Sequence, residues 1–280
     1  MADEVSSEPG EALLVQRQNG VMSIVLNRPE RKNALNRSMV AGIADAVIEA
    51  SADDVTRVVV ITANGSDFCS GVDLVESNRP GRGTSEGEER RKPRTGHLQR
   101  GFHTGAHAMI QAVSAAQVPV VSGVQGWAAG IGNALALSAD VTIAADTAKF
   151  WVPFVTKGFT PDSGNTWILP RLIGLARAKE MILRGKPVEG PKAAEWGLVS
   201  RCVPADQLGQ AVREVALEFA GLATVSIGLA KALVHTNLES SFAVGLQNEG
   251  IYEELAVRSD DFKEGVNAFM QKRSPEFTGW

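Results

Sequence analysis

The chain has 280 residues, of which 44% are hydrophobic and 21% charged, as expected for a folded globular protein and not for a disordered one. Its 28 basic and 32 acidic residues give a net charge of −4, which excludes an overall basic field for binding nucleic acid. Two cysteines, Cys69 and Cys202, are too few for a disulfide framework, and no apolar run is long enough to span a membrane. The acidic start does not resemble a signal peptide, so we expect a cytoplasmic protein.

The first elements follow a short polar tail, residues 1–11. Residues 12–17 and 21–26 are β-rich and are separated by Asn19-Gly20, the dipeptide favoured in type I′ turns. We therefore expect an antiparallel hairpin. Asn36 then precedes apolar residues at helical spacing and is expected to cap a helix.

Three short apolar runs predict buried strands in the middle of the chain. They cover residues 57–62, 119–124 and 140–144, and they are rich in β-branched residues. Because each is followed or preceded by a helical pattern, we expect stacked β-α units with mostly parallel strands.

The segment 76–97 has no aliphatic residue and predicts a mobile surface loop within a core that spans residues 12–204. A helix is expected next, at about 98–115. Residues 205–280 are predicted to be nearly all helical and to pack on the core or on a neighbouring subunit. The helices expected there cover 206–221, 225–236, 239–257 and 261–271.

Several common catalytic and binding motifs are missing. The sequence around Gly130 and Gly132 lacks the third glycine and the acidic residue of a dinucleotide-binding fingerprint. The chain contains no phosphate-binding loop, no His-Glu-x-x-His pair and no Gly-x-Ser-x-Gly motif. These absences weigh against nucleotide-dependent enzymes, zinc hydrolases and α/β-hydrolases, and no metal site is predicted.

Two glycine-containing turns remain as candidates for chemistry. One contains Gly71-Val72, and the other contains Gly130-Ile131 at the start of a predicted helix. Glycine allows the backbone to approach a ligand closely, and the first amides of a helix have no partner within the helix. The amides of Val72 and Ile131 could therefore bind one carbonyl oxygen. The alternative is that these glycines serve only turns and close packing.

The chain resembles the crotonase (enoyl-CoA hydratase/isomerase) superfamily from about residue 12 to residue 279. The resemblance rests on ordered motifs: NRPERKNAL (27–35), FCSGVDL (68–74), GWAAGIG (126–132), ADVTIA (139–144), FTPDSG (159–164), LPRLIG (169–174), AAEWGLV (193–199) and EGVNAFMQKR (264–273). It implies an α/β fold, a spiral of ββα units with a C-terminal helical trimerisation region. It also implies a homotrimer or a dimer of trimers that binds an acyl-CoA thioester, with coenzyme A as part of the substrate and no other cofactor.

The resemblance also assigns roles to individual residues. It implies that the amides of Val72 and Ile131 form an oxyanion hole, which holds the thioester oxygen as the substrate becomes an enolate. Residues expected to bind the substrate or its coenzyme A part are Lys32, Ala34, Ser70, Gly71, Asp73, Leu74, Trp127, Gly130, Phe154 and Lys272, the last reaching a neighbouring subunit's ligand.

The chain departs from the hydratases of this family at both catalytic glutamates. The two positions are occupied by Ala134 and Phe154, neither of which can exchange a proton. Asp162 matches an aspartate that serves as acid and base in enoyl-CoA, dienoyl-CoA and epoxyphenylacetyl-CoA isomerases. We therefore expect a double-bond or related isomerase, in which the aromatic residues Trp151, Phe154 and Trp167 partly bury Asp162 and raise its basicity. Alternatively, residues 161–164, which include Asp162, serve only as a helix N-cap.

Other reactions remain open. In an aryl-CoA dehalogenase of the same superfamily, the aspartate attacks the aromatic ring and a histidine activates water; His107 matches that histidine. Hydration by an altered route is a further possibility. A non-catalytic relative that binds CoA or RNA is a third class, although the net charge weighs against RNA.

Overall fold

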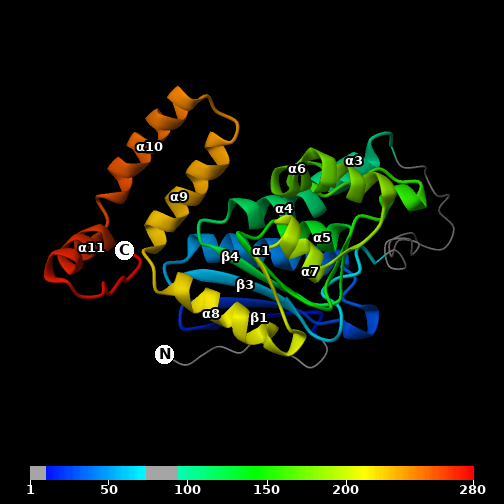
Figure 1. Cartoon of the computed structure of the whole chain (residues 1–280), viewed down its shortest axis with the longest axis horizontal. Helices are drawn as coiled ribbons and strands as arrows, with labels where there is room; N and C mark the ends of the chain where they lie inside the picture. The colour runs from blue at the N-terminus through cyan, green and yellow to red at the C-terminus, as the bar shows by residue number, and fades with distance from the viewer. Residues whose placement is uncertain (1–10, 74–93) are drawn as a thin grey trace.

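A six-stranded sheet lies at the centre of the computed structural model, which describes residues 11–73 and 94–280 (Figure 1). The strand order is β1-β2-β3-β4-β6-β9. The strands are β1 (Leu13–Gln18), β2 (Val21–Leu26), β3 (Val58–Ala63), β4 (Val120–Val124), β6 (Val141–Ala145) and β9 (Arg201–Val203). Only the β1–β2 pair is antiparallel in this sheet; the other four pairs are parallel. The predicted α/β class and mostly parallel strands are confirmed.

The predicted hairpin at the start of the sheet is confirmed. Gln18 pairs with Val21, and the two residues between them, Asn19 and Gly20, have φ angles of 52° and 77°. Positive φ at both central positions is the signature of the type I′ turn that Asn-Gly favours.

A second, three-stranded sheet carries part of the candidate site. Its order is β5-β7-β8, with β5 (Trp127–Ala129) parallel to β7 (Lys149–Trp151) and β8 (Val188–Glu189) antiparallel to β7. Short 3-10 helices connect the elements around it: η1 (Pro29–Arg31), η2 (Phe154–Lys157) and η3 (Ala205–Gln207).

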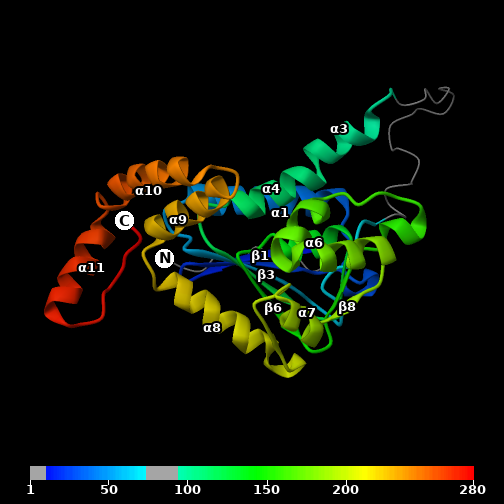
Figure 2. The ribbon, with the colours of Figure 1, turned by 45° about the horizontal axis from the view of Figure 1, so that its top comes forward.

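Helices cover both faces of the large sheet (Figure 2). On one face, Val59 and Ile61 of β3 pack in the same core as the buried residues of α1 (Arg37–Ala52), α4 (Ala106–Ala115) and α5 (Ile131–Leu137). On the other face, Val58 and Val60 pack against α8 (Leu208–Ala220). The alternation of side chains along β3 therefore explains its continuous apolar run, because both faces are buried.

Asn36 caps α1 as predicted: its Oδ1 accepts a hydrogen bond of 2.9 Å from the backbone N–H of Met39. Asn36→Ala is expected to lower the free energy of unfolding by about 1 kcal/mol, because an amide in the first turn loses its partner. Urea denaturation measures this change. Asn36→Asp keeps an acceptor and serves as the control; equal losses in both variants would show that the cap bond is not the cause.

The predicted helix at 98–115 is wrong as a single element. It is divided into α3 (His97–Thr104) and α4 by Gly105, whose φ of −117° and ψ of −103° are not helical. His103 and His107 consequently lie on different helices. Of the predicted loop, residues 76–93 lie outside the described residues, as does the tail up to residue 10. Residues 94–96 precede α3.

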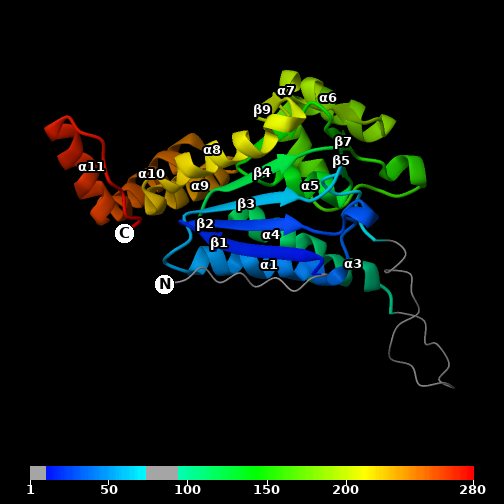
Figure 3. The ribbon, with the colours of Figure 1, turned by 90° about the horizontal axis from the view of Figure 1, so that it is seen from below.

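The remaining helices of the core lie beyond the small sheet. α6 (Asn165–Arg184) is interrupted at Gly174, which has a φ of 74° and a ψ of 163°, and α7 (Gly190–Trp196) follows β8. α7 contacts β7 and β8, and Figure 3 shows α6 and α7 close to β7.

The four helices predicted in the C-terminal region are confirmed as α8, α9 (Thr224–Asn237), α10 (Phe242–Ala256) and α11 (Asp260–Gln271). The last three extend beyond one end of the large sheet (Figures 1 and 3). The Lys231 Nζ of α9 is 2.7 Å from Asp140 Oδ2, which also accepts a 2.7 Å hydrogen bond from the amide of Val120. Asp140 therefore joins α9 to the start of β4.

Within the described residues, no single helix has the length and apolar character needed to cross a membrane. Residues 205–220 and 224–237 pass such a test only when taken together, and they are bent by 104° relative to each other.

Candidate active site

The two glycine-containing turns predicted from the sequence lie side by side. Cys69 forms a parallel bridge to Ala128: its N–H donates to Trp127 O at 2.7 Å, and its carbonyl accepts from Ala129 N at 2.9 Å. Gly132 packs directly on Cys69, since a Cβ at position 132 would lie only 2.6 Å from Cys69 Cβ. The chain segments that carry Val72 and Ile131 are therefore packed against each other.

The amide of Val72 faces away from the segment that flanks it. Leu35 donates to Gly71 O at 2.8 Å and accepts from Asp73 N at 2.9 Å, as in a parallel bridge. In this pattern the N–H and C=O of the intervening residue, Val72, point away from the partner. No described residue accepts a hydrogen bond from this N–H.

The amide of Ile131 is the first of α5. Gly130 is the N-cap, with a φ of 57° and a ψ of −115°; its N–H donates to Trp151 O at 2.9 Å, and its carbonyl accepts from Ala134 N at 3.1 Å. Among the described residues, none accepts from the Ile131 N–H. A helix-start amide without an acceptor suits an oxygen that gains negative charge.

The residues expected on the coenzyme A side come together around residues 32–35. Ser70 N donates to Lys32 O at 2.9 Å, and Ala34 lies between Lys32 and Leu35, which pairs with Val72. The Lys32 side chain is largely exposed. Asp73, by contrast, is buried and forms a 3.0 Å ion pair with Arg28. Leu74 lies outside the described residues.

Asp162 lies in the loop before α6. Its Oδ1 accepts a 2.6 Å hydrogen bond from Ser163 Oγ, whereas the N-cap of α6 is Gly164 and has no side-chain cap. The N-cap of α6 thus lies within the predicted segment 161–164, but the Asp162 side chain does not cap the helix. Burial raises the pKa of Asp162 above its ordinary value, although the hydrogen bond from Ser163 and the nearby His107 each lower it.

His107 of α4 is thus close enough to Asp162 to affect its titration. The His107 ring stacks on Phe102, with ring centroids 5.7 Å apart and an interplanar angle of 22°. Ile110, one turn further along α4, lies near Gly164, because a Cβ at position 164 would be 3.7 Å from its Cγ2. α4 therefore supports the Asp162 loop.

Asp162→Asn is expected to stabilise the fold at neutral pH. Because burial holds the folded-state pKa of Asp162 above its unfolded value, the wild-type protein loses stability as pH rises from the unfolded pKa through the folded pKa. Asparagine does not titrate and avoids this loss.

Urea unfolding between pH 4 and pH 8 measures the effect. The stability gap between Asp162→Asn and the wild type should be largest at pH 8 and shrink toward pH 4. The exposed Asp206 supplies the control variant, Asp206→Asn. A gap that stays constant, or grows as the pH falls, would contradict the prediction.

Aromatic residues of β5, β7 and η2 lie next to the second turn. The rings of Trp127 and Trp151 have centroids 5.2 Å apart, and Trp151 Nε1 donates to Gly185 O at 2.7 Å. The ring of Phe154 lies against Gly130, whose added Cβ would be 3.5 Å from Phe154 Cζ. Trp167 is 40% exposed, and the Arg171 guanidinium lies 3.8 Å from its ring centroid. Trp167 is therefore covered by Arg171 on one side.

Lys272 does not join the two turns within one chain. It is the C-cap of α11, and α11 lies at the end of the molecule opposite to α6 (Figure 1). Its predicted contact with a neighbouring subunit's ligand stays a prediction.

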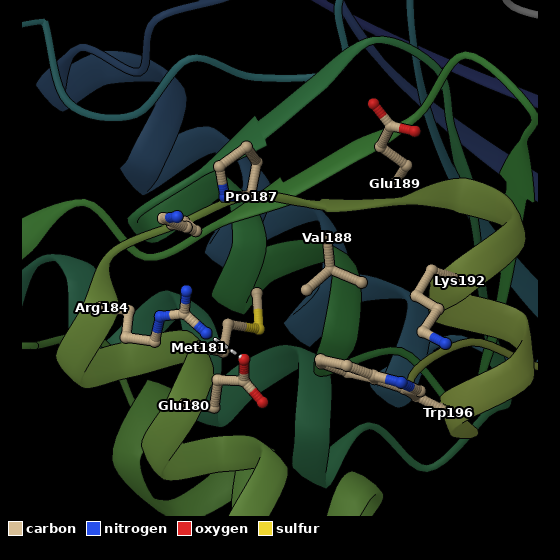
Figure 4. A pocket seen from close by; sticks show the side chains of 9 residues that line it. Glu180, Met181, Arg184, Pro187, Val188, Glu189, Lys192 and Trp196 are labelled. Atoms are coloured by element: carbon tan, nitrogen blue, oxygen red, sulfur yellow. Dashed lines mark hydrogen bonds and ion pairs between the residues drawn. The ribbon is translucent and has the colours of Figure 1, made fainter.

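A separate pocket lies between α6, β8 and α7, and Figure 4 shows it with the ion pair between Glu180 and Arg184. Its lining contains none of the residues predicted for the site. The lining residues are Glu180, Met181, Arg184, Lys186, Pro187, Val188, Glu189, Lys192 and Trp196.

One feature of the site could not be predicted from the sequence, a buried pair of asparagines. Asn133 Nδ2 donates to Asn165 Oδ1 at 2.8 Å, and Asn165 Nδ2 donates to the carbonyls of Gly130, at 3.2 Å, and Asp162, at 3.1 Å. The pair therefore connects the turn at Gly130–Ile131 to the loop that carries Asp162.

Comparison with known proteins agrees with this architecture. The sequence model of the enoyl-CoA hydratase/isomerase family matches residues 16–280. The 1,2-epoxyphenylacetyl-CoA isomerase of Escherichia coli is 36% identical over 269 residues, which cover 96% of this chain and 99% of that protein. A probable enoyl-CoA hydratase of Rhodobacter capsulatus is 36% identical and covers 93% of this chain and 95% of its own.

Solved structures show the same fold. A putative enoyl-CoA hydratase/isomerase from Mycobacterium abscessus superposes with a TM-score of 0.85 at 33% identity, over 96% of this chain and 100% of that one. An enoyl-CoA hydratase from Bacillus anthracis gives a TM-score of 0.86 at 29% identity, with the same coverage. The fold is that of the crotonase superfamily. Within it, the chain belongs to the enoyl-CoA hydratase/isomerase family, whose members act on acyl-CoA thioesters.

Proposed function

We propose that this protein is an acyl-CoA isomerase that works through an enolate. The amides of Val72 and Ile131 hold the thioester oxygen, and Asp162 moves the proton. With a 3-enoyl-CoA, the Asp162 carboxylate takes a proton from C2, and the electrons pass into the carbonyl to give a dienolate. The carboxylic acid then returns the proton to C4, which leaves the double bond between C2 and C3. One carboxylate is sufficient for this sequence.

The observation that carries the proposal is the placement of Asp162 beside the second turn. Through Asn165, its backbone is one side chain away from Gly130 O, and its carboxyl has a raised pKa. A base with a pKa nearer to neutral also makes a better acid when it returns the proton. Ala134 and Phe154, which replace the glutamates of hydratases, favour isomerisation over hydration, as does the similarity to an enzyme named 1,2-epoxyphenylacetyl-CoA isomerase.

Binding and turnover assays test the proposal. Isothermal titration with acyl-CoAs of increasing chain length identifies the tightest ligand. Incubation with 3-enoyl-CoAs and with 1,2-epoxyphenylacetyl-CoA should then yield isomerised products without added cofactor or metal. Tight binding without turnover of any of them would instead identify a non-catalytic CoA-binding relative, and accumulation of 3-hydroxyacyl-CoA from 2-enoyl-CoA would identify a hydratase that works by another route.

The closeness of His107 and Asp162 favours one second candidate, an aryl-CoA dehalogenase-like hydrolase. In that reaction Asp162 attacks the ring carbon that bears chlorine and chloride leaves, and water activated by His107 then hydrolyses the aryl ester. Repeated turnover that releases chloride from 4-chlorobenzoyl-CoA would support it, with His107→Gln releasing only about one chloride per subunit and accumulating the aryl ester. If no chloride is released, this second candidate is wrong.

We also propose a homotrimer or a dimer of trimers. The C-terminal helices expose large apolar side chains, including Phe242, Ile251, Phe269 and Met270. An exposed apolar surface of this kind is typical of an interface between subunits. Light scattering on the purified protein would show a monomer if the proposal is wrong. A cytoplasmic location and the lack of a nucleic-acid partner stay predictions.

A further inference from the structure

Asn165 has an unusual set of hydrogen bonds for a residue at the start of a helix. It is the first residue of α6 and only 1% exposed, and its amide nitrogen donates to the carbonyls of Gly130, at 3.2 Å, and Asp162, at 3.1 Å. Its Oδ1 accepts from Asn133 Nδ2 at 2.8 Å. A single side chain therefore donates one hydrogen bond to the turn at Gly130–Ile131 and one to the loop that carries Asp162.

The chemistry of these partners fixes the orientation of the amide. Carbonyl oxygens only accept, so the nitrogen of Asn165 must face Gly130 and Asp162, and its oxygen must face Asn133. Asn133, with no exposed surface, then has to present its own nitrogen, and its Oδ1 has no hydrogen-bond partner within the described residues. A buried carbonyl without a partner is unfavourable. The asparagine pair therefore costs stability compared with a fully hydrogen-bonded or apolar pair. This cost favours a role in positioning the groups that the pair binds.

The bond from Asn165 acts on the peptide group that matters for catalysis. The carbonyl of Gly130 and the N–H of Ile131 belong to one peptide unit, and in a trans peptide the C=O and N–H bonds point in opposite directions. The glycine at 130 (φ 57°, ψ −115°) has no Cβ to restrict rotation of this peptide. If the peptide turned over, a carbonyl oxygen instead of an N–H group would face the substrate.

We propose that Asn165 is a positioning residue that holds the Gly130–Ile131 peptide with its N–H directed at the thioester oxygen, and that ties this peptide to the Asp162 loop. The inference rests on the oxyanion hole proposed above. Asn133 aligns the Asn165 amide for this task. The backbone N–H of Ala134 also donates to Gly130 O, at 3.1 Å. Because this bond lies within the first turn of α5, it does not connect the Gly130–Ile131 peptide to the Asp162 loop.

The test is the carbonyl signal of bound [1-13C]butyryl-CoA, a saturated thioester that cannot be isomerised. Two N–H donors polarise the carbonyl, so binding to the wild type should lower its stretching frequency and move its 13C resonance downfield. In Asn165→Ala both signals should return toward their values in free solution. For a 3-enoyl-CoA, kcat should fall at least about tenfold, short of the 10²–10³-fold loss of a whole donor, and KM should change less than kcat.

Asn248→Ala is the matched control. Asn248 Nδ2 donates to Asn237 Oδ1 at 3.0 Å, so this variant also breaks an asparagine pair, but one between α10 and α9. It should leave the carbonyl signal unchanged. If Asn165→Ala does not fold, Asn165→Ser takes its place, because a single hydroxyl cannot donate to both carbonyls.

The outcomes separate this inference from the proposed function. If the wild type shifts the carbonyl signal and the Asn165 variant shifts it equally with unchanged kcat, Asn165 has no positioning role, while the oxyanion hole stands. If the wild type itself leaves the signal of the bound thioester unshifted, the oxyanion hole is wrong and this inference falls with it.

Discussion

Asp162→Asn is expected to lower kcat for isomerisation by about 10²–10⁴-fold, the usual contribution of a general acid–base residue. Asparagine has nearly the same shape, and its side-chain oxygen can still accept the hydrogen bond from Ser163. It cannot take up the proton that the carboxylate removes. The affinity for saturated acyl-CoAs should therefore change little, and the loss should appear in kcat and not in binding.

Steady-state assays with a 3-enoyl-CoA, combined with isothermal titration, measure both quantities. Asp206→Asn, in the exposed η3 segment, is the control and should keep wild-type turnover. Because the Asp162 variant is also expected to be more stable at neutral pH, a loss of activity by unfolding is readily distinguished. Turnover within about threefold of the wild type would remove Asp162 from the mechanism, whatever its pKa.

Asp162→Asn is thus expected to raise stability and to lower turnover, and both effects have the same cause. The burial that raises the pKa of Asp162 makes its charged form costly in the folded state, and the same burial brings its pKa closer to the value that suits proton transfer at neutral pH. A carboxylate that lowers stability and lies in a loop close to the candidate oxyanion hole is better explained by function than by folding.

Local features of the fold could be predicted because short segments determine them. Asn19-Gly20 allows few turns other than the one observed, and Asn36 makes its cap bond within its own helix. The break at Gly105 could not be predicted, because a glycine inside an apolar pattern is compatible with either a continuous or a divided helix.

The site could be predicted only in part, because it depends on contacts between segments that are far apart in the sequence. The motifs around Val72 and Ile131 indicate which amides to examine, but whether the two segments touch depends on the bridge between Cys69 and Ala128, which sequence spacing does not reveal. The asparagine pair is harder still. Asn133 and Asn165 belong to different motifs, and each alone has the appearance of an ordinary polar residue near a helix start.

The close packing of Cys69 on α5 leads to the second large effect. Gly132→Ala is expected to reduce kcat/KM by about 10²–10³-fold, the cost of losing one oxyanion-hole donor. The new Cβ would lie 2.6 Å from Cys69 Cβ and 2.7 Å from Cys69 O, far inside van der Waals contact. Both residues are buried, so the clash can be relieved only by moving the Ile131 amide away from the segment that carries Val72.

The variant should also lose about 1–3 kcal/mol of stability, as overpacked cores do. Thermal unfolding measures this loss, and assays well below the melting temperature separate it from the change in turnover. Gly209→Ala in α8 is the control, because a Cβ there meets no atom within 4 Å and alanine favours a helix. It should keep full activity.

The loss in Gly132→Ala cannot be attributed to the Cys69 thiol. Burial raises the pKa of this thiol to about 12, so it is un-ionised at neutral pH and does not serve as a nucleophile. Cys69→Ala should consequently retain turnover. If folded Gly132→Ala also retains it, the two segments can separate without harm, and the amides of Val72 and Ile131 do not act on a shared oxygen. A large loss confined to Gly132→Ala is the result expected if their spacing sets the rate.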